Sequence, residues 1–259
     1  MNLLLLKPHE IRDQQVELTD RRAEHLRKVL RAGEGDLVRV GVVNGPMGLG
    51  RIIGLTTDRV TLGLTLSIPP PPPPATDLIL ALPRPIMLKR VLAQAASLGV
   101  RKIFLTNANR VEKSFFHASL IRDNALEEPL LLGLEQAIDT ILPEISVHER
   151  FRPFVEDLLP GLISDCPTRL LAHPAGDQTL ADLARRNNSD RIVLAIGPEG
   201  GWVDFEVRKF REQGFTLFSM GPRILRVDTA VPALLAQINL LRCLAGRETE
   251  CGQQPLPEG

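Results

Sequence analysis

The stretch Arg191-Ile-Val-Leu-Ala-Ile-Gly-Pro-Glu-Gly-Gly-Trp202 decides the fold class of this 259-residue sequence. Its first half is a short apolar run with β-branched residues, which is typical of a buried strand. A glycine-rich turn follows, and residues 204–213 read as a helix. A buried strand that passes through such a turn into a helix is the repeating unit of an α/β fold with a parallel sheet.

The same alternation extends on both sides of this stretch. One helix, residues 85–98, begins near Pro85 and stops at Gly99, as expected for a proline near the start and a glycine after the end. The remaining predicted strands are residues 78–82, 102–106, 169–172 and 216–220, and the remaining helices are residues 119–142, 179–186, 204–213 and 229–245. This order predicts a mostly parallel sheet covered by helices on both faces.

Six consecutive prolines, Pro69 to Pro74, separate this region from a different N-terminal part. Proline fixes φ and lacks an N–H group, so the run should form a stiff spacer. A peptide ligand for a proline-reading domain is the other interpretation, and we favour a linker because the chain changes character across it. The predicted division is a domain over 1–68, a linker over 69–75, a domain over 76–247 and a disordered tail over 248–259.

The N-terminal part is predicted to be a small β-barrel with one helix. Its strands are residues 37–43, 49–55 and 60–66, which are separated by turn residues such as Asn44-Gly45-Pro46. The helix can be capped by Thr19 or Asp20 and carries Ala23, Leu26, Val29 and Leu30 on one face. Its opposite face is basic, and this face is either a solvated surface or a contact for RNA.

Composition sets outer limits on function. The 31 basic and 31 acidic residues give no net charge, which excludes a polybasic mode of gripping nucleic acid. Residues 1–68 hold 10 basic and 8 acidic residues, so the excess there is mild. No apolar run reaches the roughly 18–20 residues of a membrane helix. The three cysteines, Cys166, Cys243 and Cys251, show no pairing pattern, which predicts free thiols and a cytoplasmic location.

Several kinds of chemistry have no matching pattern in this sequence. It contains no G-x-x-x-x-G-K-[ST] phosphate loop, no G-x-S-x-G elbow and no C-x-x-C pair. Its five histidines are scattered, so we predict no metal site.

Two segments follow predicted strands and carry the chemistry. The first, residues 196–202, is Ile-Gly-Pro-Glu-Gly-Gly-Trp, whose glycines allow backbone groups to approach a ligand at the carboxyl edge of the sheet. The second, residues 219–230, presents Arg223, Arg226 and Asp228 around a rigid Gly-Pro pair, with Asp228 or Thr229 available as a helix cap. The alternatives are a plain tight turn for the first and arginines that merely pair with Asp228 for the second.

These two motifs, GPEGGW followed by MGPRILRVDTA, resemble the signature of the bacterial 16S ribosomal RNA uridine N3-methyltransferases, the RsmE family of the SPOUT superfamily. The segments HLRKVLRAGEGD, SLGVRKIF and EQ before PEI also have counterparts in that family, so the resemblance covers nearly the whole chain. It implies an N-terminal PUA-like β-barrel, a C-terminal SPOUT α/β domain with a deep trefoil knot, and a homodimer with no membrane partner.

The resemblance further implies S-adenosyl-L-methionine as cofactor and 16S ribosomal RNA, or the small ribosomal subunit, as partner. The cofactor residues carried over are Leu171, Ala172, His173, Ile196, Gly197, Glu199, Gly200, Gly201, Met220, Gly221, Leu225, Thr229 and Ala230.

Methylation at uracil N3 requires loss of the N3 proton, and we assign this chemistry to Arg223, Arg226 and Asp228 without fixing which is the general base. The predicted RNA-contacting residues are Arg22, Arg27, Lys28, Arg31 and Arg110. Two alternatives stay open: a SPOUT methyltransferase for another RNA or base position, and a non-catalytic RNA-binding paralogue.

The sequence departs from the family pattern at a few positions. Asp228 stands where the family usually has glutamate. Gln94 and Ser97 replace a lysine and an acidic residue, and Asp139 replaces an arginine. These exchanges leave the identity of the RNA target open. The sequence also leaves open which nucleotide is methylated and how two subunits divide the site.

Overall fold

A computed structural model describes residues 2–123, 125–182 and 191–244 of the chain. It divides into two compact units. Among the described residues, the first comprises residues 2–73 and 131–142, and the second comprises the described residues of 74–130 and of 143–244. Each unit contains one six-stranded sheet.

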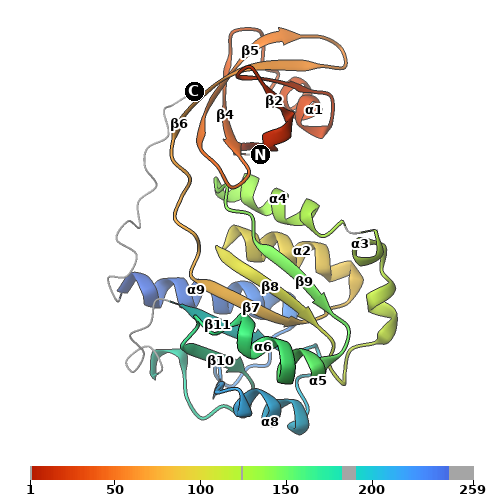
Figure 1. Ribbon diagram of the computed structural model, residues 1–259, viewed down its shortest axis with the longest axis vertical. Coiled ribbons are helices and arrows are strands. Elements are labelled where there is room, and N and C mark those ends of the chain that lie inside the picture. The colour runs from red at the N-terminus through yellow and green to blue at the C-terminus, as the bar shows by residue number, and fades with distance from the viewer. Residues whose placement is uncertain (1, 124, 183–190, 245–259) are drawn as a thin grey trace. The chain divides into compact units, whose positions relative to one another are not determined.

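The first sheet has the strand order β1-β4-β5-β6-β3-β2 (Figure 1). Its strands are β1 (Leu4–Leu6), β2 (Ile11–Arg12), β3 (Gln15–Leu18), β4 (Leu37–Val42), β5 (Met47–Leu55) and β6 (Val60–Ile68). All pairs are antiparallel except β1 with β4, which is parallel from Leu4 opposite Val40. One apolar core fills this unit, built from strand residues such as Val16, Ile52 and Leu62 together with Leu26 of helix α1.

Helix α1 (Arg21–Lys28) begins where Asp20 accepts a hydrogen bond from the Arg22 amide, as its sequence predicts. Ala23 and Leu26 are buried in the core. Arg22 is also buried, and its guanidinium donates to the Leu5 carbonyl and to the carboxylates of Glu10 and Asp20. Arg22 therefore fastens α1 to β1 and to η1 (Pro8–Glu10).

Residues 131–142, which the sequence assigned to the C-terminal domain, group with the N-terminal unit. Buried Glu135 accepts both guanidinium nitrogens of Arg21 at 2.9 and 3.0 Å. The Asn44 amide donates to the Thr140 carbonyl at 2.7 Å, and the Thr140 hydroxyl donates to Gly45. These bonds join residues about a hundred positions apart, which no local pattern reveals.

The second sheet is parallel throughout, in the order β12-β10-β11-β7-β8-β9. Its strands are β7 (Thr76–Ala81), β8 (Val100–Thr106), β9 (Glu144–His148), β10 (Thr168–Ala172), β11 (Ile192–Ile196) and β12 (Thr216–Phe218). The central strand β7 is buried at every residue, as expected for a sheet covered on both faces. The mixed α/β class is confirmed.

Helices α2 (Pro85–Ser97) and α9 (Val227–Leu244) pack against each other and against β8 and β11 (Figure 1). The other helices are η2 (Lys113–His117), α3 (Ser119–Arg122), α4 (Glu127–Ala137), α5 (Phe151–Pro153), the π-helix η3 (Phe154–Leu158), α6 (Leu159–Leu162) and α8 (Asp204–Glu212). A further helix begins at Leu180, and its predicted remainder lies outside the described residues, as does the predicted tail.

The predicted single helix over residues 119–142 is wrong. Pro129 lies in the first turn of α4, where its missing N–H breaks no hydrogen bond of the helix. If the helix extended further toward the N-terminus, the proline ring would clash with the carbonyl group four residues earlier. At the other end Ile138 adopts a left-handed conformation, φ 59°, which terminates the helix. The sequence also missed β1, β9 and the helical segment from Phe151 to Leu162, which are short or interrupted by proline.

By length and composition α9 is apolar enough to cross a membrane, with a mean hydropathy of 1.2. This is weak evidence, since core helices of other proteins pass the same test. Val231, Leu234, Leu235 and Ile238 of α9 are buried within the second unit, so one face of the helix belongs to its core.

Candidate cofactor and substrate site

One cavity of about 410 Å³ lies at the carboxyl ends of β10, β11 and β12. This volume falls inside the roughly 300–1,000 Å³ range of cofactor and small-molecule sites. The residues that line it come from three segments, residues 172–174, 196–202 and 218–225, and from Val227, Ala230 and Leu234 of α9. The two sequence motifs therefore meet in one place, as expected for loops that leave neighbouring parallel strands at the same edge.

The glycine-rich loop is held in shape by a buried carboxylate. Glu206, which is 2% exposed, accepts from the Val203 amide at 2.9 Å and from the Asn109 amide at 2.6 Å. The first bond is the return half of a capping box at the start of α8. The second ties the loop to the segment after β8. Gly201 has φ 75°, a conformation that side chains rarely adopt.

Two side chains lie directly against this loop. Arg110 donates to the Gly200 carbonyl, and a Cβ atom on Gly200 would lie 2.7 Å from Arg110 Cδ. Trp202 packs over Gly197, where a Cβ atom would lie 3.1 Å from the indole Nε1. That Nε1 is buried and has no hydrogen-bond partner in the described part of the chain, so a residue with an unused donor lines the cavity.

The second loop places Arg223 in the cavity wall, whereas Arg226 and Asp228 of the predicted catalytic set are not among the residues that line it. Arg223 is exposed. Arg226 Nε lies 3.5 Å from Asp228 Oδ1, and the Arg226 side chain is 76% exposed. The structure does not use Asp228 or Thr229 as a helix cap. Both lie in the first turn of α9, where the Arg226 carbonyl accepts from the amides of Thr229 and Ala230.

His173 forms part of the opposite wall. Its Nδ1 accepts from the Ala175 amide at 3.1 Å, so in the neutral ring the proton is on Nε2. Its own amide donates to the Phe218 carbonyl, which fixes the loop after β10 to β12. A donor nitrogen is thus available at the cavity.

Most of the predicted cofactor residues meet here. All of them line the cavity except Leu171 and Thr229. Leu171 is fully buried in β10, and Thr229 is exposed on α9, so neither is part of the wall. Sequence reasoning missed other lining residues: Pro174, Pro198, Trp202, Phe218, Ser219, Pro222, Ile224, Val227 and Leu234. The signal was partly available, because several of these stand inside the two quoted motifs.

The predicted RNA-contacting set is corrected at one position. Arg22 is 8% exposed and committed to three acceptors, so it is not part of a surface. Arg31 is exposed, Arg27 donates to the Ala23 carbonyl, and Lys28 pairs with Glu24 at 2.6 Å on an open face. Arg110 is exposed but holds the Gly200 carbonyl.

The structure shows the contacts of three positions that depart from the family pattern, Asp139, Ser97 and Gln94. Asp139 Oδ1 accepts from the Ile141 amide at 2.8 Å, and burial raises the pKa of Asp139. The Ser97 hydroxyl donates to the Ala93 carbonyl. Gln94 Oε1 on α2 is buried without a partner among the described residues.

One group of side chains of the kinds that bind metals lies among the described residues, at the amino-terminal edge of the second sheet. Asp77, Asp165 and Cys166 have ligand atoms within 4.8 Å of one another. Arg101 Nη2 lies 2.5 Å from Asp77 and Arg101 Nη1 lies 2.9 Å from Asp165, and Arg191 Nη2 lies 2.8 Å from Asp165, so both carboxylates are already paired with guanidinium groups. Burial raises the pKa of the Cys166 thiol to about 12, which keeps it protonated. This cluster is a structural ion pair.

The sequence and the structure were compared with known proteins. Residues 70–239 match the RNA methyltransferase domain family. Ribosomal RNA small subunit methyltransferase E of Treponema pallidum (strain Nichols) is 31% identical over 92% of this chain and 90% of its own length. The enzyme of the same name from Synechocystis sp. (strain ATCC 27184 / PCC 6803 / Kazusa) is 31% identical over 92% and 77%.

Among solved structures, a ribosomal RNA small subunit methyltransferase E from Neisseria gonorrhoeae, bound to S-adenosyl methionine, has a TM-score of 0.75. It is 24% identical over 93% of this chain and 98% of its own. This likeness shows a shared fold over both units.

Proposed function

The chain belongs to the ribosomal RNA small subunit methyltransferase E family, and we propose that it transfers a methyl group from S-adenosylmethionine to N3 of a uridine in 16S ribosomal RNA. The observation that carries this proposal is the single cavity in which the GPEGGW and MGPRILRVDTA loops meet. The alternatives are methylation of another RNA or base position, and a silent RNA-binding protein.

The residues present fit the cofactor. The cavity has the volume of a cofactor site and is lined on one side by glycine backbone. Trp202 Nε1 offers a buried donor without a partner among residues 2–123, 125–182 and 191–244, and a bound ligand could satisfy it. The start of α9 also faces the cavity through Val227 and Ala230, and helix N-termini favour acceptor groups. We assign cofactor binding to the glycine loop, the His173 loop and the start of α9.

S-adenosylmethionine supplies a methyl group on a positively charged sulfur, so the work of the protein is positioning and charge stabilisation. Uracil N3 becomes nucleophilic when it loses its proton. Arg223 at the cavity rim would stabilise the resulting anion, and Arg226 would do so with its orientation set by Asp228, 3.5 Å away. Asp228 is 17% exposed and is our candidate to accept the proton.

The RNA would reach this site with the target base out of its stack. We propose that the N-terminal unit holds the flanking RNA through the exposed cations Lys28 and Arg31 and the half-buried Arg27, with Arg110 contacting it near the active site. A ribosomal RNA loop has the unstacked bases that such binding needs.

We further propose the finer architecture that the family resemblance implies: closure of the first sheet into a PUA-like barrel, a trefoil knot in the second unit and a homodimer. The dimer has support in large apolar side chains that lie exposed on the described surface. Leu240 and Leu244, one turn apart on α9, are 57% and 75% exposed. Ile86 on α2 and Ile224 in the arginine loop are 85% and 83% exposed.

The deciding experiment is nucleoside mass mapping of ribosomal RNA from a strain that lacks the gene, with and without the purified protein and S-adenosylmethionine added back. Loss and recovery of 3-methyluridine at one position of 16S RNA is the expected result. Recovery of a different methylated nucleoside would favour the other-position enzyme. No change, with cofactor binding absent in calorimetry, would favour the silent protein.

A further inference from the structure

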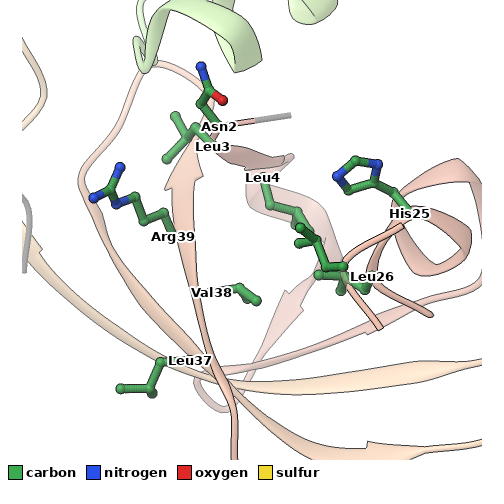
Figure 2. Close-up of a pocket in the computed structure, with 9 residues that line it drawn as sticks. Asn2, Leu3, Leu4, His25, Leu26, Leu37, Val38 and Arg39 are labelled. Carbon is green, nitrogen blue, oxygen red and sulfur yellow. The ribbon is translucent and has the colours of Figure 1, made fainter. Parts of the chain in front are cut away.

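A second pocket, of about 200 Å³, lies wholly within the N-terminal unit, far along the chain from the methyltransferase motifs. Figure 2 shows Asn2 and Leu4 of the N-terminal segment, His25 and Leu26 of α1, and Val38 and Arg39 of β4 around it. Its volume is several times the roughly 30 Å³ share of a water molecule but below the roughly 300 Å³ at which cofactor sites begin. The pocket therefore suits one ring-sized group.

The polar side of this pocket is an imidazole with an unmet hydrogen-bonding requirement. His25 Nε2 is buried and has no partner in the described part of the chain. Burial lowers the pKa of His25, so the ring is neutral near pH 7 and offers one donor or one acceptor. Because a buried polar atom without a partner is costly, such an atom in a pocket wall points to a ligand.

The strand edge in this pocket is also unpaired. The first three residues of β4, Leu37 to Arg39, pair with β5 on one side. On the other side β1 joins β4 only from Val40 onward, because the Asn2 and Leu3 amides turn away to the Glu135 carbonyl. The edge of Leu37–Arg39 that faces the pocket therefore has no strand partner among the described residues, and its main-chain groups can hydrogen-bond to the edge of a planar ligand.

The rim combines apolar surface with positive charge. Leu30 lines the pocket and is 52% exposed, although it follows a helix whose other apolar residues are buried. Arg39 makes no hydrogen bond or ion pair with any described residue, and in Figure 2 it stands on the opposite side of the pocket from His25. Arg31, also exposed, follows Leu30 directly. A flat ring bound between these groups would place a negatively charged group attached to it near Arg39 and Arg31.

We propose that this pocket binds one unstacked nucleobase of single-stranded RNA, with His25 Nε2 on the base edge, Leu30 against its face and Arg39 on the adjoining phosphate. The proposal rests on the proposed function, which makes RNA the substrate, and adds a second point of recognition away from the methylated base. Stacking and edge bonding of splayed bases is the usual way in which proteins read RNA loops. An apolar peptide side chain would leave both His25 and Arg39 unused, so the charge pattern favours RNA.

The test uses the full-length protein and single-stranded RNA octamers that carry one 4-thiouridine. Irradiation followed by mass spectrometry is expected to place the cross-link in peptides that contain His25 to Leu30 or Leu37 to Arg39. In a titration by fluorescence anisotropy, the variants His25→Phe, Leu30→Ala and Arg39→Gln should each weaken binding about tenfold, in line with roughly 1–3 kcal/mol per stacked base. The control is Arg59→Gln, which removes an exposed cation of β5–β6 that pairs with Glu17.

The results separate failure of the pocket proposal from failure of the proposed function. If wild-type protein binds the octamers and the three variants bind equally well, with cross-links elsewhere, the pocket proposal is overturned and RNA binding stands. If wild-type protein binds no octamer at any salt concentration, the pocket proposal fails, and the mass mapping of ribosomal RNA decides the proposed function separately. Leu30 is a surface side chain, so Leu30→Ala tests the pocket even if His25→Phe fails to fold. A cross-link in this pocket that His25→Phe and Arg39→Gln both diminish supports the site.

Discussion

At the residue scale, the chemistry of the proposed site depends on a few groups whose surroundings differ sharply. Trp202 Nε1 is buried with no hydrogen-bond partner among the described residues, whereas Arg223 in the cavity wall and Arg226 three residues further along are exposed. A buried donor is already desolvated, so a ligand that accepts from it gains the bond at little further cost. The exposed arginines can reach an incoming base. We therefore propose that Trp202 takes part in cofactor binding and that the arginines contact the substrate.

Replacing Trp202 with Phe separates binding from stability. The ring still packs against Phe210 and Phe151, with which Trp202 makes edge contacts, but the donor is lost. We expect S-adenosylmethionine affinity, measured by calorimetry, to fall about tenfold, which is about 1.4 kcal/mol. The free protein should melt at the same temperature or higher, since an unsatisfied donor is removed. Phe151→Leu, the control, should lower the melting temperature and leave affinity unchanged; unchanged affinity in Trp202→Phe would contradict the assignment.

Asp228→Asn tests the proton acceptor. Asparagine is nearly the same size but cannot take the uracil proton, so the methylation rate at saturating RNA should fall by about a hundredfold or more, the usual range for a general base. Cofactor affinity should not change. The melting temperature should fall only slightly, because a carboxylate in the first turn of a helix contributes about 0.3–1 kcal/mol. Asp228→Glu should stay active. Normal turnover in Asp228→Asn would leave the arginines as the sole catalytic groups.

At the element scale, the site depends on how the ends of helices are fixed. Glu206 at the start of α8 holds both the glycine loop and the segment after β8, although it touches no cavity directly. The ladder of β1 and β4 similarly decides where the second pocket opens, because it begins only at Val40. A longer β1 would pair with Leu37–Arg39 and cover the edge of β4 that now faces the second pocket.

Glu206→Ala should loosen the glycine loop. It leaves the amides of Val203 and Asn109 without acceptors in a buried setting, at a cost of about 2–3 kcal/mol in unfolding free energy. Urea titration measures this loss, and cofactor affinity should weaken with it. Glu212→Ala at the other end of α8 removes only an exposed partner of Lys209 and should change stability by less than about 0.5 kcal/mol. Equal effects from the two variants would refute the loop role of Glu206.

The attachment of α1 predicts a dependence of stability on pH. Burial alone would raise the pKa of Glu10 and Asp20, but hydrogen bonds from Arg22 outweigh it, so the pKa of each carboxyl lies below its ordinary value. A carboxyl group whose pKa is lowered in the folded protein stabilises the fold at pH values above its ordinary pKa of about 4. This stabilisation is lost as the pH falls. The melting temperature should therefore drop as pH falls below about 5, and less steeply in Glu10→Gln. Parallel curves for the two proteins would assign the acid sensitivity elsewhere.

At the scale of the whole molecule, α9 carries apolar side chains, Leu240 and Leu244, that are exposed in the single chain. Leu240→Glu should give a monomer in sedimentation experiments if these side chains join two subunits, because a buried charge without a partner opposes association. Arg211→Glu, on exposed α8, is the control and should leave the oligomeric state unchanged. A wild-type monomer at micromolar concentration would remove the proposed homodimer.

Much of this fold could be predicted from local patterns. The strands and helices around residues 191–213 alternate with the periods of a buried strand and a helix, and the structure has β11 and α8 there. Parallel strands put their carboxyl ends at one edge, so the meeting of the two loop motifs also followed from sequence. The helix over residues 119–142 failed because Pro129 and the left-handed Ile138 outweighed apolar periodicity.

The sequence by itself determined the α/β class, the two loop motifs and the family, because each is written in residues close together in the chain. Tertiary packing alone shows that Arg22 is buried, that residues 131–142 join the N-terminal unit, and that Trp202 Nε1 and His25 Nε2 find no partner among the residues that the structure describes. The physical reason is that burial and hydrogen-bond partners depend on residues far away in sequence. Arg22 looked like its neighbours Arg21 and Arg27 on a basic helix, and its three acceptors became visible only when α1 was packed against β1.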